Sequence, residues 1–218
     1  MKQFLFLFLL VPALHMKAQD AIEVSKEPLH KNVFENEYLR VLDVRLQPGD
    51  TTMFHKHSTP SVFISLHPVK TGSQVIVEDG TATALSPDRT ITFEGFYKSP
   101  RIHRVWNADT SLFHVMDIEI LTKGNQNIGE PIIADGFKQL FDAPPVRTYR
   151  VTLKRSQSIE LKRNRLLLIV GLDDAGKVMV NKKLFAQQGD FLFLQPSENV
   201  RLVNEDEKEY SLAVLELK

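Results

Sequence analysis

Residues 48–61 read PGDTTMFHKHSTPS, and residues 99–107 read SPRIHRVWN. His55 and His57 lie two positions apart in a run of strand-forming residues, so their imidazoles should project from the same face of one strand. His103 begins a second run of strand-forming residues. Two histidines of one strand and a third from a strand folded over it would supply three nitrogen ligands. The spacing therefore predicts a metal site made by His55, His57 and His103.

The first twenty residues have the composition of a secretory signal. Lys2 precedes an apolar run from Phe4 to Val11, and Ala18 is a small residue at an acceptable cleavage position. The run is too short to span a bilayer permanently, so we expect no stable membrane span after residues 1–18 are removed. With no cysteine, the chain can form neither a disulfide nor a lipid anchor on Cys. We predict a periplasmic or secreted protein.

The overall composition is that of an ordinary globular protein. The chain has 218 residues, 43% of them hydrophobic, and 27 basic residues balance 27 acidic ones. Such a length allows one or two domains with a sizeable core. Because the charges balance, nothing in the global charge predicts a nucleic-acid partner.

The second half of the chain repeats the first. FENEYLRVLDVRL (34–46) aligns with FDAPPVRTYRVTL (141–153) at an offset of 107 positions, and 94–109 has a shorter echo in 188–206. Both echoes end in a turn that begins with Asn, a residue that satisfies local backbone groups. We predict two related β units, 31–120 and 147–218, joined by a connector at 121–146. Residues 133–141 (IADGFKQLF) could form a short helix within it.

Short alternating runs separated by turns predict an all-β sandwich or barrel. We expect strands at 38–46, 51–57, 61–66, 74–78, 90–94, 102–106, 111–120, 148–154, 157–161, 165–170, 178–182, 190–195, 199–203 and 209–217.

Two motifs resemble those of the cupin superfamily. Gly49, His55 and His57 look like the first cupin motif, and Gly95, His103 and Asn107 look like the second. The resemblance covers residues 35–120 well and 141–218 weakly. It implies two double-stranded β-helix (jelly-roll) barrels, that is, a bicupin with a degenerate second barrel. It also implies a divalent metal (Fe, Mn, Ni, Cu or Zn) on His55, His57 and His103.

The chain departs from the cupin pattern at one ligand. The glutamate that usually follows the second histidine by four positions is replaced by Ser61. Three neutral imidazoles can still hold a divalent ion, with more coordination positions left for water or substrate. Some cupin-like thiol dioxygenases use such a centre, so the loss does not exclude catalysis.

The second unit lacks the histidines. The offset of 107 places Lys162 and Asn164 at the positions of His55 and His57, and Val200 or Arg201 replaces His103. We therefore interpret this unit as a scaffold, an interface or a lid.

The remaining candidates are pocket-lining residues, namely Ser61, Met53, Phe63 and His114. His114 alternates with Met116 and Ile118, which favours packing or pocket lining over a fourth ligand. We expect His30 and His67 to be solvated. Trp106 should point outward and be covered by another chain segment, the second unit or a second subunit, so a homodimer is one expectation.

Three functions are consistent with these features. The first is a metal-dependent enzyme acting on a small molecule, with oxygenase, isomerase and lyase chemistry all open. The alternative is a non-catalytic bicupin that binds a small molecule or a carbohydrate. The third is a structural or assembly protein, which would show a large apolar face around Trp106 and no accessible cavity. We expect no catalytic side chain beyond the metal ligands to be identifiable, since Ser61 has no acid–base partner nearby in sequence.

Overall fold

The computed structural model describes residues 21–77, 83–84, 90–96, 98–124, 128–174, 176–196 and 199–218. The expected signal segment, 1–18, lies outside these ranges. The regular structure of the described chain consists of strands and one short 3-10 turn, η1 (Val24–Lys26). None of its helical segments is long and apolar enough to cross a membrane. The all-β prediction is confirmed.

In the described part of the chain, the first half of the molecule contains ten strands. They are β1 (Ile22–Glu23), β2 (His30–Glu35), β3 (Leu39–Leu46), β4 (His55–His57), β5 (Ser61–His67), β6 (Thr71–Val77), β7 (Thr83–Ala84), β8 (Ile91–Glu94), β9 (Arg101–Asn107) and β10 (Phe113–Ile120).

The second half contains nine. They are β11 (Phe137–Ala143), β12 (Val146–Leu153), β13 (Ser158–Lys162), β14 (Leu167–Gly171), β15 (Val178–Val180), β16 (Lys183–Phe185), β17 (Phe191–Leu194), β18 (Asn199–Asn204) and β19 (Tyr210–Leu217).

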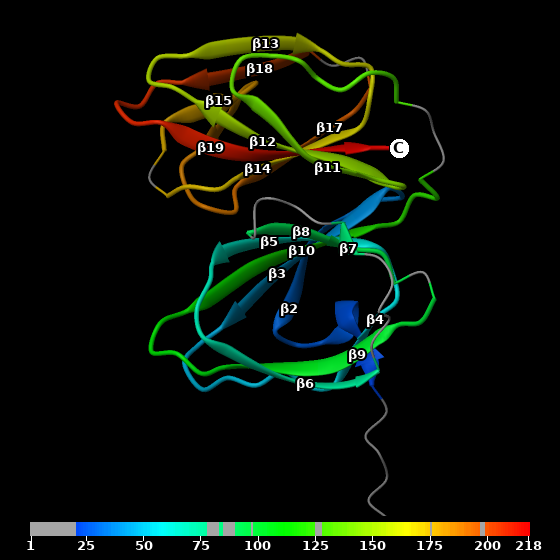
Figure 1. The fold of residues 1–218 in the computed structure, drawn as a ribbon. Helices are drawn as coiled ribbons and strands as arrows, with labels where there is room; N and C mark the ends of the chain where they lie inside the picture. Colours follow the sequence, from blue (N-terminus) through cyan, green and yellow to red (C-terminus); the bar gives the residue numbers. More distant parts are fainter. Residues whose placement is uncertain are drawn as a thin grey trace, which may run out of the picture.

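Each half consists of a larger and a smaller sheet. The first half has the strand orders β2-β3-β10-β5-β8-β7 and β1-β4-β9-β6, and the second has β11-β12-β19-β14-β17 and β13-β18-β15-β16. The two larger sheets face each other across the middle of the molecule, with the smaller sheets on the outside (Figure 1). The second half therefore supports the first over a broad face.

Alternation along the strands explains why the larger sheets pack together. Val62 and Ile64 of β5 are buried on one face of the sheet. Met116 and Ile118 of β10 are their cross-strand partners and are buried on the same face. These side chains join one apolar cluster with residues of β14 and β19 from the second half. Phe93 of β8 lies in the same cluster, with its ring centroid 6.1 Å from that of Phe141. One core thus spans both halves.

Phe93→Ala should destabilise the whole protein by about 3–5 kcal/mol, because it leaves a cavity in the shared core. The measurement is urea unfolding followed by circular dichroism. Val33→Ala is a matched control, since Val33 is 46% exposed and its loss should change stability by less than about 0.5 kcal/mol. An equally small effect at Phe93 would contradict a shared core.

The interiors of the two halves differ in how completely apolar side chains fill them. The second half encloses a large apolar cluster that includes Tyr149, Phe185 and Leu212, whereas the described apolar cluster inside the first half is small, with Val24, Leu42 and Val44 and with Val115 packed against them. The remaining interior of the first half is lined in part by histidines. Space for a ligand therefore exists inside the first half.

The repeat seen in the sequence reappears as repeated contacts. The side-chain amide of Asn107 donates to the carbonyls of Leu46 and Ser111 at 2.9 and 2.8 Å. Asn204 donates in the same way to the carbonyls of Leu153 and Lys208 at 3.0 and 2.8 Å. Both asparagines thus pin the turn before the last strand of their half.

The ion pairs repeat as well. Arg40 of β3 pairs with Glu35 at 2.8 Å and with Glu119 at 2.5 Å. Its counterpart Arg147, 107 positions later, pairs with Asp142 at 3.0 Å and with Glu216 at 3.6 Å. The two halves therefore share local architecture as well as strand order.

The structure differs from the elements predicted from the sequence at several places. The predicted helix at 133–141 is wrong: Phe137–Ala143 form β11, which pairs with β12 because Leu140, Phe141 and Ala143 are buried against the shared core. The connector without strands is thus shorter than 121–146, and the first half begins with β1 and β2, ahead of the predicted start at 31. The strand expected at 51–57 is regular only over His55–His57.

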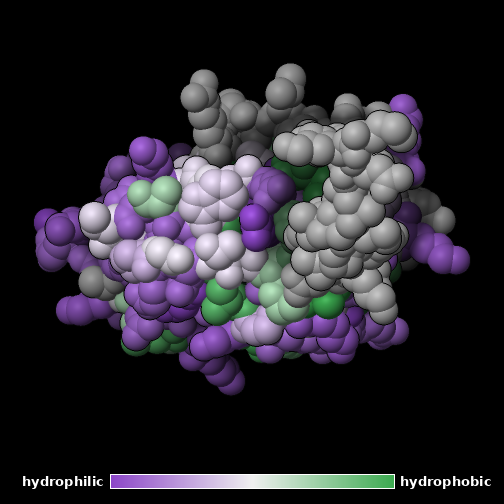
Figure 2. All heavy atoms as spheres, turned by 90° about the horizontal axis from the view of Figure 1, so that it is seen from below, coloured by the Kyte–Doolittle hydropathy of each residue, from purple (hydrophilic) through white to green (hydrophobic). Residues whose placement is uncertain are grey.

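Trp106 is covered within the chain. A side-chain carbon added to Gly72 of the neighbouring strand β6 would lie 2.0 Å from Cε2 of Trp106, so the indole packs on the bare glycine backbone. The outer face of the first half carries exposed Val75, Ile76 and Val77 on β6. Seen from below, the molecule is largely hydrophilic, with separate apolar areas between hydrophilic residues (Figure 2).

Candidate metal centre

Strand register brings the three predicted histidines together. His55 and His103 are direct partners in the antiparallel pair β4–β9, and His57 is two residues along the same face of β4. The ring centroids lie 5.0 Å apart for His55–His57, 4.6 Å for His55–His103 and 5.1 Å for His57–His103. One ligand atom from each ring lies within 4.8 Å of the other two.

The hydrogen bonds orient these rings for a ligand between them. Nδ1 of His55 lies 2.9 Å from the carbonyl oxygen of Met53. A carbonyl only accepts, so Nδ1 carries the hydrogen and Nε2 keeps its lone pair. Nε2 of His57 and Nε2 of His103 face each other at 3.1 Å. Two such nitrogens need either a hydrogen or a cation between them.

The rings are electrically suited to a cation. Burial lowers the pKa of His55 and His57 to about 3, with the other imidazoles nearby adding to the effect. Burial lowers the pKa of His103 to about 2, and its neighbours His57 and His55 contribute. All three imidazoles are therefore neutral at pH 7 and offer lone pairs.

The donor geometry fits a transition metal. Metal–nitrogen bonds of about 2.0–2.1 Å give nitrogen separations of about 3.4 Å in a tetrahedron and about 2.9 Å in an octahedron. The separation of 3.1 Å between His57 and His103 lies between these values. Three imidazoles suit Fe, Mn, Ni, Cu or Zn better than the oxygen-seeking Ca²⁺ or Mg²⁺.

A cavity of about 130 Å³ opens beside the three rings. Phe63 lines it as predicted, with Thr52, Phe113 and Val105. The lining is mostly apolar with a few polar points, which is usual for a small-molecule site. Its apolar members lie on alternate positions of β3, β5, β9 and β10, so strand alternation aims them inward.

Asp117 is a site residue that the sequence analysis missed. It lies on β10, is 1% exposed and lines the cavity. One of its oxygens lies 3.4 Å from Nδ1 of His57. Burial raises the pKa of Asp117 to about 6. A carboxylate behind a ligating imidazole raises the basicity of that ligand, so Asp117 supplies charge that Ser61 cannot.

Asp117→Asn should weaken metal affinity by about 10- to 100-fold, the usual loss for a carboxylate behind a histidine ligand. Competition with a chromophoric chelator measures the affinity. Asn keeps the shape of the side chain, so folding by circular dichroism should be unchanged. Unaltered affinity would show that the carboxylate does not act on His57.

His30 and Glu27 were also missed, and the prediction that His30 is solvated is wrong. His30 is 8% exposed and lines the cavity, with its ring centroid 4.6 Å from that of His55. Its Nδ1 lies 2.7 Å from Oε2 of Glu27. No sequence signal could have found them, because a polar segment such as VSKEPLHKN does not reveal that η1 and β2 fold against the site.

Two other predicted residues, Ser61 and Met53, do not line the cavity. Ser61 is fully buried but donates its hydroxyl to the carbonyl of Thr59. Met53 is 38% exposed and does not line the cavity, because it precedes the regular part of β4.

The prediction that His114 lines the site is wrong. It shares a face of β10 with Met116, as predicted, but that face turns toward the second half. There, Nε2 of His114 lies 2.6 Å from Asp43. The exposed His67 lies near it, at a different pocket that includes residues of the second half.

Among its described residues, the second half has no equivalent group of histidines. Val200 pairs with Leu161 at the place where His103 pairs with His55, and Val200 belongs to the apolar interior. The strand pairing therefore aligns His55 with Leu161, one position before the residue that the offset of 107 gives. By the same alignment, Arg163 corresponds to His57. Its Nε lies 2.5 Å from Glu216.

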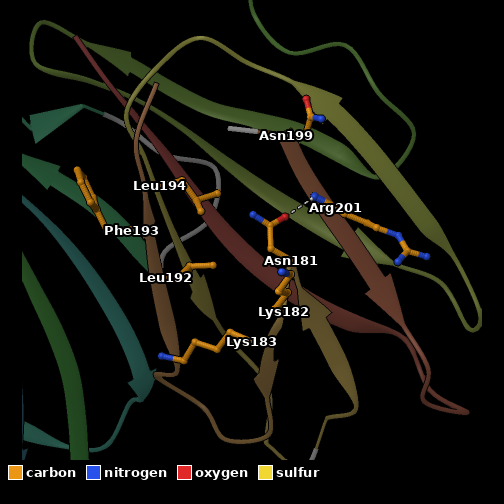
Figure 3. Close-up of a pocket in the computed structure, with 8 residues that line it drawn as sticks. All are labelled: Asn181, Lys182, Lys183, Leu192, Phe193, Leu194, Asn199 and Arg201. Atoms are coloured by element: carbon orange, nitrogen blue, oxygen red, sulfur yellow. Dashed lines mark hydrogen bonds between the residues drawn. The ribbon is translucent and has the colours of Figure 1, made fainter. Parts of the chain in front are cut away.

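A larger groove of about 780 Å³ lies on the surface of the second half (Figure 3). Its labelled lining includes Lys182, Lys183 and Arg201 on one side and Leu192 and Phe193 on the other. None of its lining residues is a histidine or a carboxylate. The groove therefore has no metal-ligating set, and the chemistry concentrates in the smaller cavity.

Comparison with known proteins rests on structure. No protein-family model and no curated protein matches the sequence. YhhW from Escherichia coli superposes with a TM-score of 0.56 at 11% identity, covering 88% of this chain and 89% of that one. A cupin 2 conserved barrel domain protein from Leptotrichia buccalis gives 0.50 at 13% identity, covering 86% and 88%.

Salicylate 1,2-dioxygenase from Pseudoaminobacter salicylatoxidans, in its adducts with gentisate, gives a TM-score of 0.53 at 12% identity, covering 84% of this chain and 70% of that one. Identities this low establish architecture and no more. The chain has the cupin fold.

Proposed function

We propose that this protein is a metal-dependent enzyme that transforms a small molecule in the cavity of the first half. The observation that carries the proposal is the convergence of His55, His57 and His103, whose ligand atoms lie within 4.8 Å of one another. Each half would be a cupin barrel, and the second would have lost its metal site and kept a supporting role.

The surroundings of the triad support catalysis. A bound divalent ion would supply Lewis-acid or redox chemistry to a coordinated molecule. The apolar lining of Phe63, Phe113 and Val105 excludes bulk water, which strengthens polar interactions inside the cavity. A salicylate dioxygenase among the structural neighbours adds support for oxygenase chemistry within the proposal.

The test loads the purified full chain separately with Fe, Mn, Ni, Cu and Zn and measures retained metal by elemental analysis. We expect one ion per chain. Incubating the loaded protein with a panel of small hydroxylated compounds, while recording oxygen uptake and analysing products, separates oxygenases from isomerases and lyases. The same panel with His57→Ala should give no turnover.

Two results would contradict the proposal. Failure to retain a stoichiometric ion with any of the metals removes its basis. Retention of metal together with recovery of every bound compound unchanged indicates a binding protein without turnover.

We further propose that the protein is exported to the periplasm or beyond. The apolar run from Phe4 to Val11 behind Lys2 supports this. Expression of the full chain in a bacterial host, followed by fractionation and N-terminal sequencing, should find mature protein that begins at Gln19 outside the cytoplasm. An intact N-terminus in the cytoplasmic fraction would contradict export.

A further inference from the structure

Glu27 and His30 form a buried pair with a defined hydrogen. Glu27 is 3% exposed and accepts hydrogen bonds from the backbone amides of Leu29 at 2.7 Å and Met53 at 3.1 Å. The same carboxylate lies 2.7 Å from Nδ1 of His30. Because two amides already donate to it, the carboxylate acts as an acceptor, and Nδ1 of His30 carries the hydrogen. In the neutral form of the ring, Nε2 of His30 then holds the lone pair.

The His30 ring is placed where a ligand in the cavity can reach it. The His30 ring lines the cavity, with its centroid 4.6 Å from that of His55 and 6.5 Å from that of His57. Nδ1 is turned to Glu27, so Nε2 is the ring nitrogen left for a ligand. His30 is not part of the group of three whose ligand atoms converge. It is thus an acceptor placed beside the metal position.

The charges around the cavity favour an uncharged ligand. A divalent ion on three neutral imidazoles would be balanced by two buried carboxylates, Glu27 and Asp117. Among the described residues, no lysine or arginine lines the cavity. The nearby Arg101 is paired with Glu94 at 3.1 Å. An anionic ligand would therefore leave the buried site with an uncompensated negative charge, which is costly.

The cavity volume limits the size of that ligand. At about 130 Å³, it is close to the roughly 150 Å³ of a cavity that binds benzene. A molecule with a single ring, or one end of a longer molecule, fills it. Its apolar body would contact Phe63 and Phe113, and its polar group would reach the metal.

We propose that His30, oriented by Glu27, accepts a hydrogen bond from the hydroxyl group of a small uncharged substrate bound at the metal. This inference rests on the proposed function and assigns its substrate class. His30 contacts the substrate, and Glu27 acts through His30 as a positioning residue.

The second half supplies a natural comparison. Strand β11 corresponds to β2 at the offset of 107, so Phe137 occupies the position of His30. Phe137 packs edge-on against Tyr149, with centroids 5.8 Å apart. The half without the three histidines thus also lacks the acceptor, and it shows that the fold accommodates phenylalanine at this position.

The experiment compares two probes of equal heavy-atom count on the zinc-loaded full chain. Phenol carries a hydroxyl, and fluorobenzene does not. Isothermal titration calorimetry measures both affinities for the wild type, His30→Phe and His30→Gln. We expect His30→Phe to weaken phenol binding by about 10-fold, which corresponds to about 1.4 kcal/mol for one buried hydrogen bond, and to leave fluorobenzene within about 2-fold. Glutamine restores an acceptor oxygen, so His30→Gln should recover part of the loss.

Each other outcome has a definite meaning. Equal weakening of both probes by His30→Phe would show that the ring only shapes the cavity, which overturns the inference. Loss of zinc from His30→Phe would make His30 a ligand, which also overturns it. Absence of zinc from the wild type is a different result, because it removes the proposed function itself along with this inference.

Discussion

His57→Ala should remove stoichiometric metal from the protein and lower its metal affinity by more than about 100-fold. His57 faces His103 across 3.1 Å and is backed by Asp117, so its loss removes one of three ligands and the partner of the buried carboxylate. Loss of a carboxylate behind a ligand alone costs about 10- to 100-fold, and loss of a ligand should exceed that. Elemental analysis after dialysis and chelator competition give the two measurements.

The matched control is His67→Ala. It removes an imidazole from the exposed end of β5 and leaves the triad intact, so the metal content should equal that of the wild type. Equal metal content in His57→Ala and wild type would place the ion elsewhere, whereas equal loss in both variants would point to adventitious binding by surface histidines.

The metal-free protein should lose stability steeply as the pH falls from 6.5 toward 4. The folded pKa values of His55, His57 and His103 are lowered to about 3, 3 and 2 from 6.5. In this range the unfolded chain binds three protons that the folded chain excludes, so the free energy of unfolding falls with pH. Three protons amount to about 4 kcal/mol per pH unit.

Asp117 opposes this loss. Its folded pKa is raised from 3.8 to about 6, so below pH 6 the folded chain holds one proton that the unfolded chain lacks. The net uptake on unfolding is then two protons, and the slope falls to about 2.7 kcal/mol per pH unit. The stability is therefore fully present above pH 6.5 and is lost most steeply toward pH 5.

Urea unfolding with a chelator present, at intervals between pH 5 and pH 8, measures the slope. His103→Gln removes one titrating ring and should reduce the slope by about 1.4 kcal/mol per pH unit. Saturating zinc should shift the loss to lower pH, because the ion competes with protons for the same nitrogens. A stability that is flat from pH 8 to pH 5 would mean that the three rings are protonated equally in both states.

Local pattern was enough to predict most of the strands and the triad. The alternation of Val62, Ile64 and Leu66, together with Ser61 and Ser65 on the other face, predicts a strand, whatever it packs against. His55 and His57 share a face because the side-chain period of a strand is two residues. The second-motif spacing of His103 then required only that two strands pair in register, which β4 and β9 do.

Local sequence pattern led to wrong predictions where contacts between distant parts of the chain decide the structure. Residues 133–141 mix apolar and polar side chains in a way that suits a helix, yet the shared core makes Phe137–Ala143 a strand. His114 alternates correctly, but alternation alone does not say which face of β10 turns toward the cavity. The second half decides that, because its larger sheet covers Met116 and Ile118.

The sequence by itself determined an all-β chain with an internal repeat and three histidines able to meet, because these features depend on the strand period and on short-range spacing. Only the tertiary structure decided that Asp117 stands behind His57 and that Glu27 holds His30 beside His55. Asp117 and His57 lie on strands, 60 positions apart in the sequence. Glu27 and His30 come from a turn and a strand that precede the barrel motifs. A buried carboxylate needs a partner wherever the fold provides one, and sequence separation does not limit which residue that is.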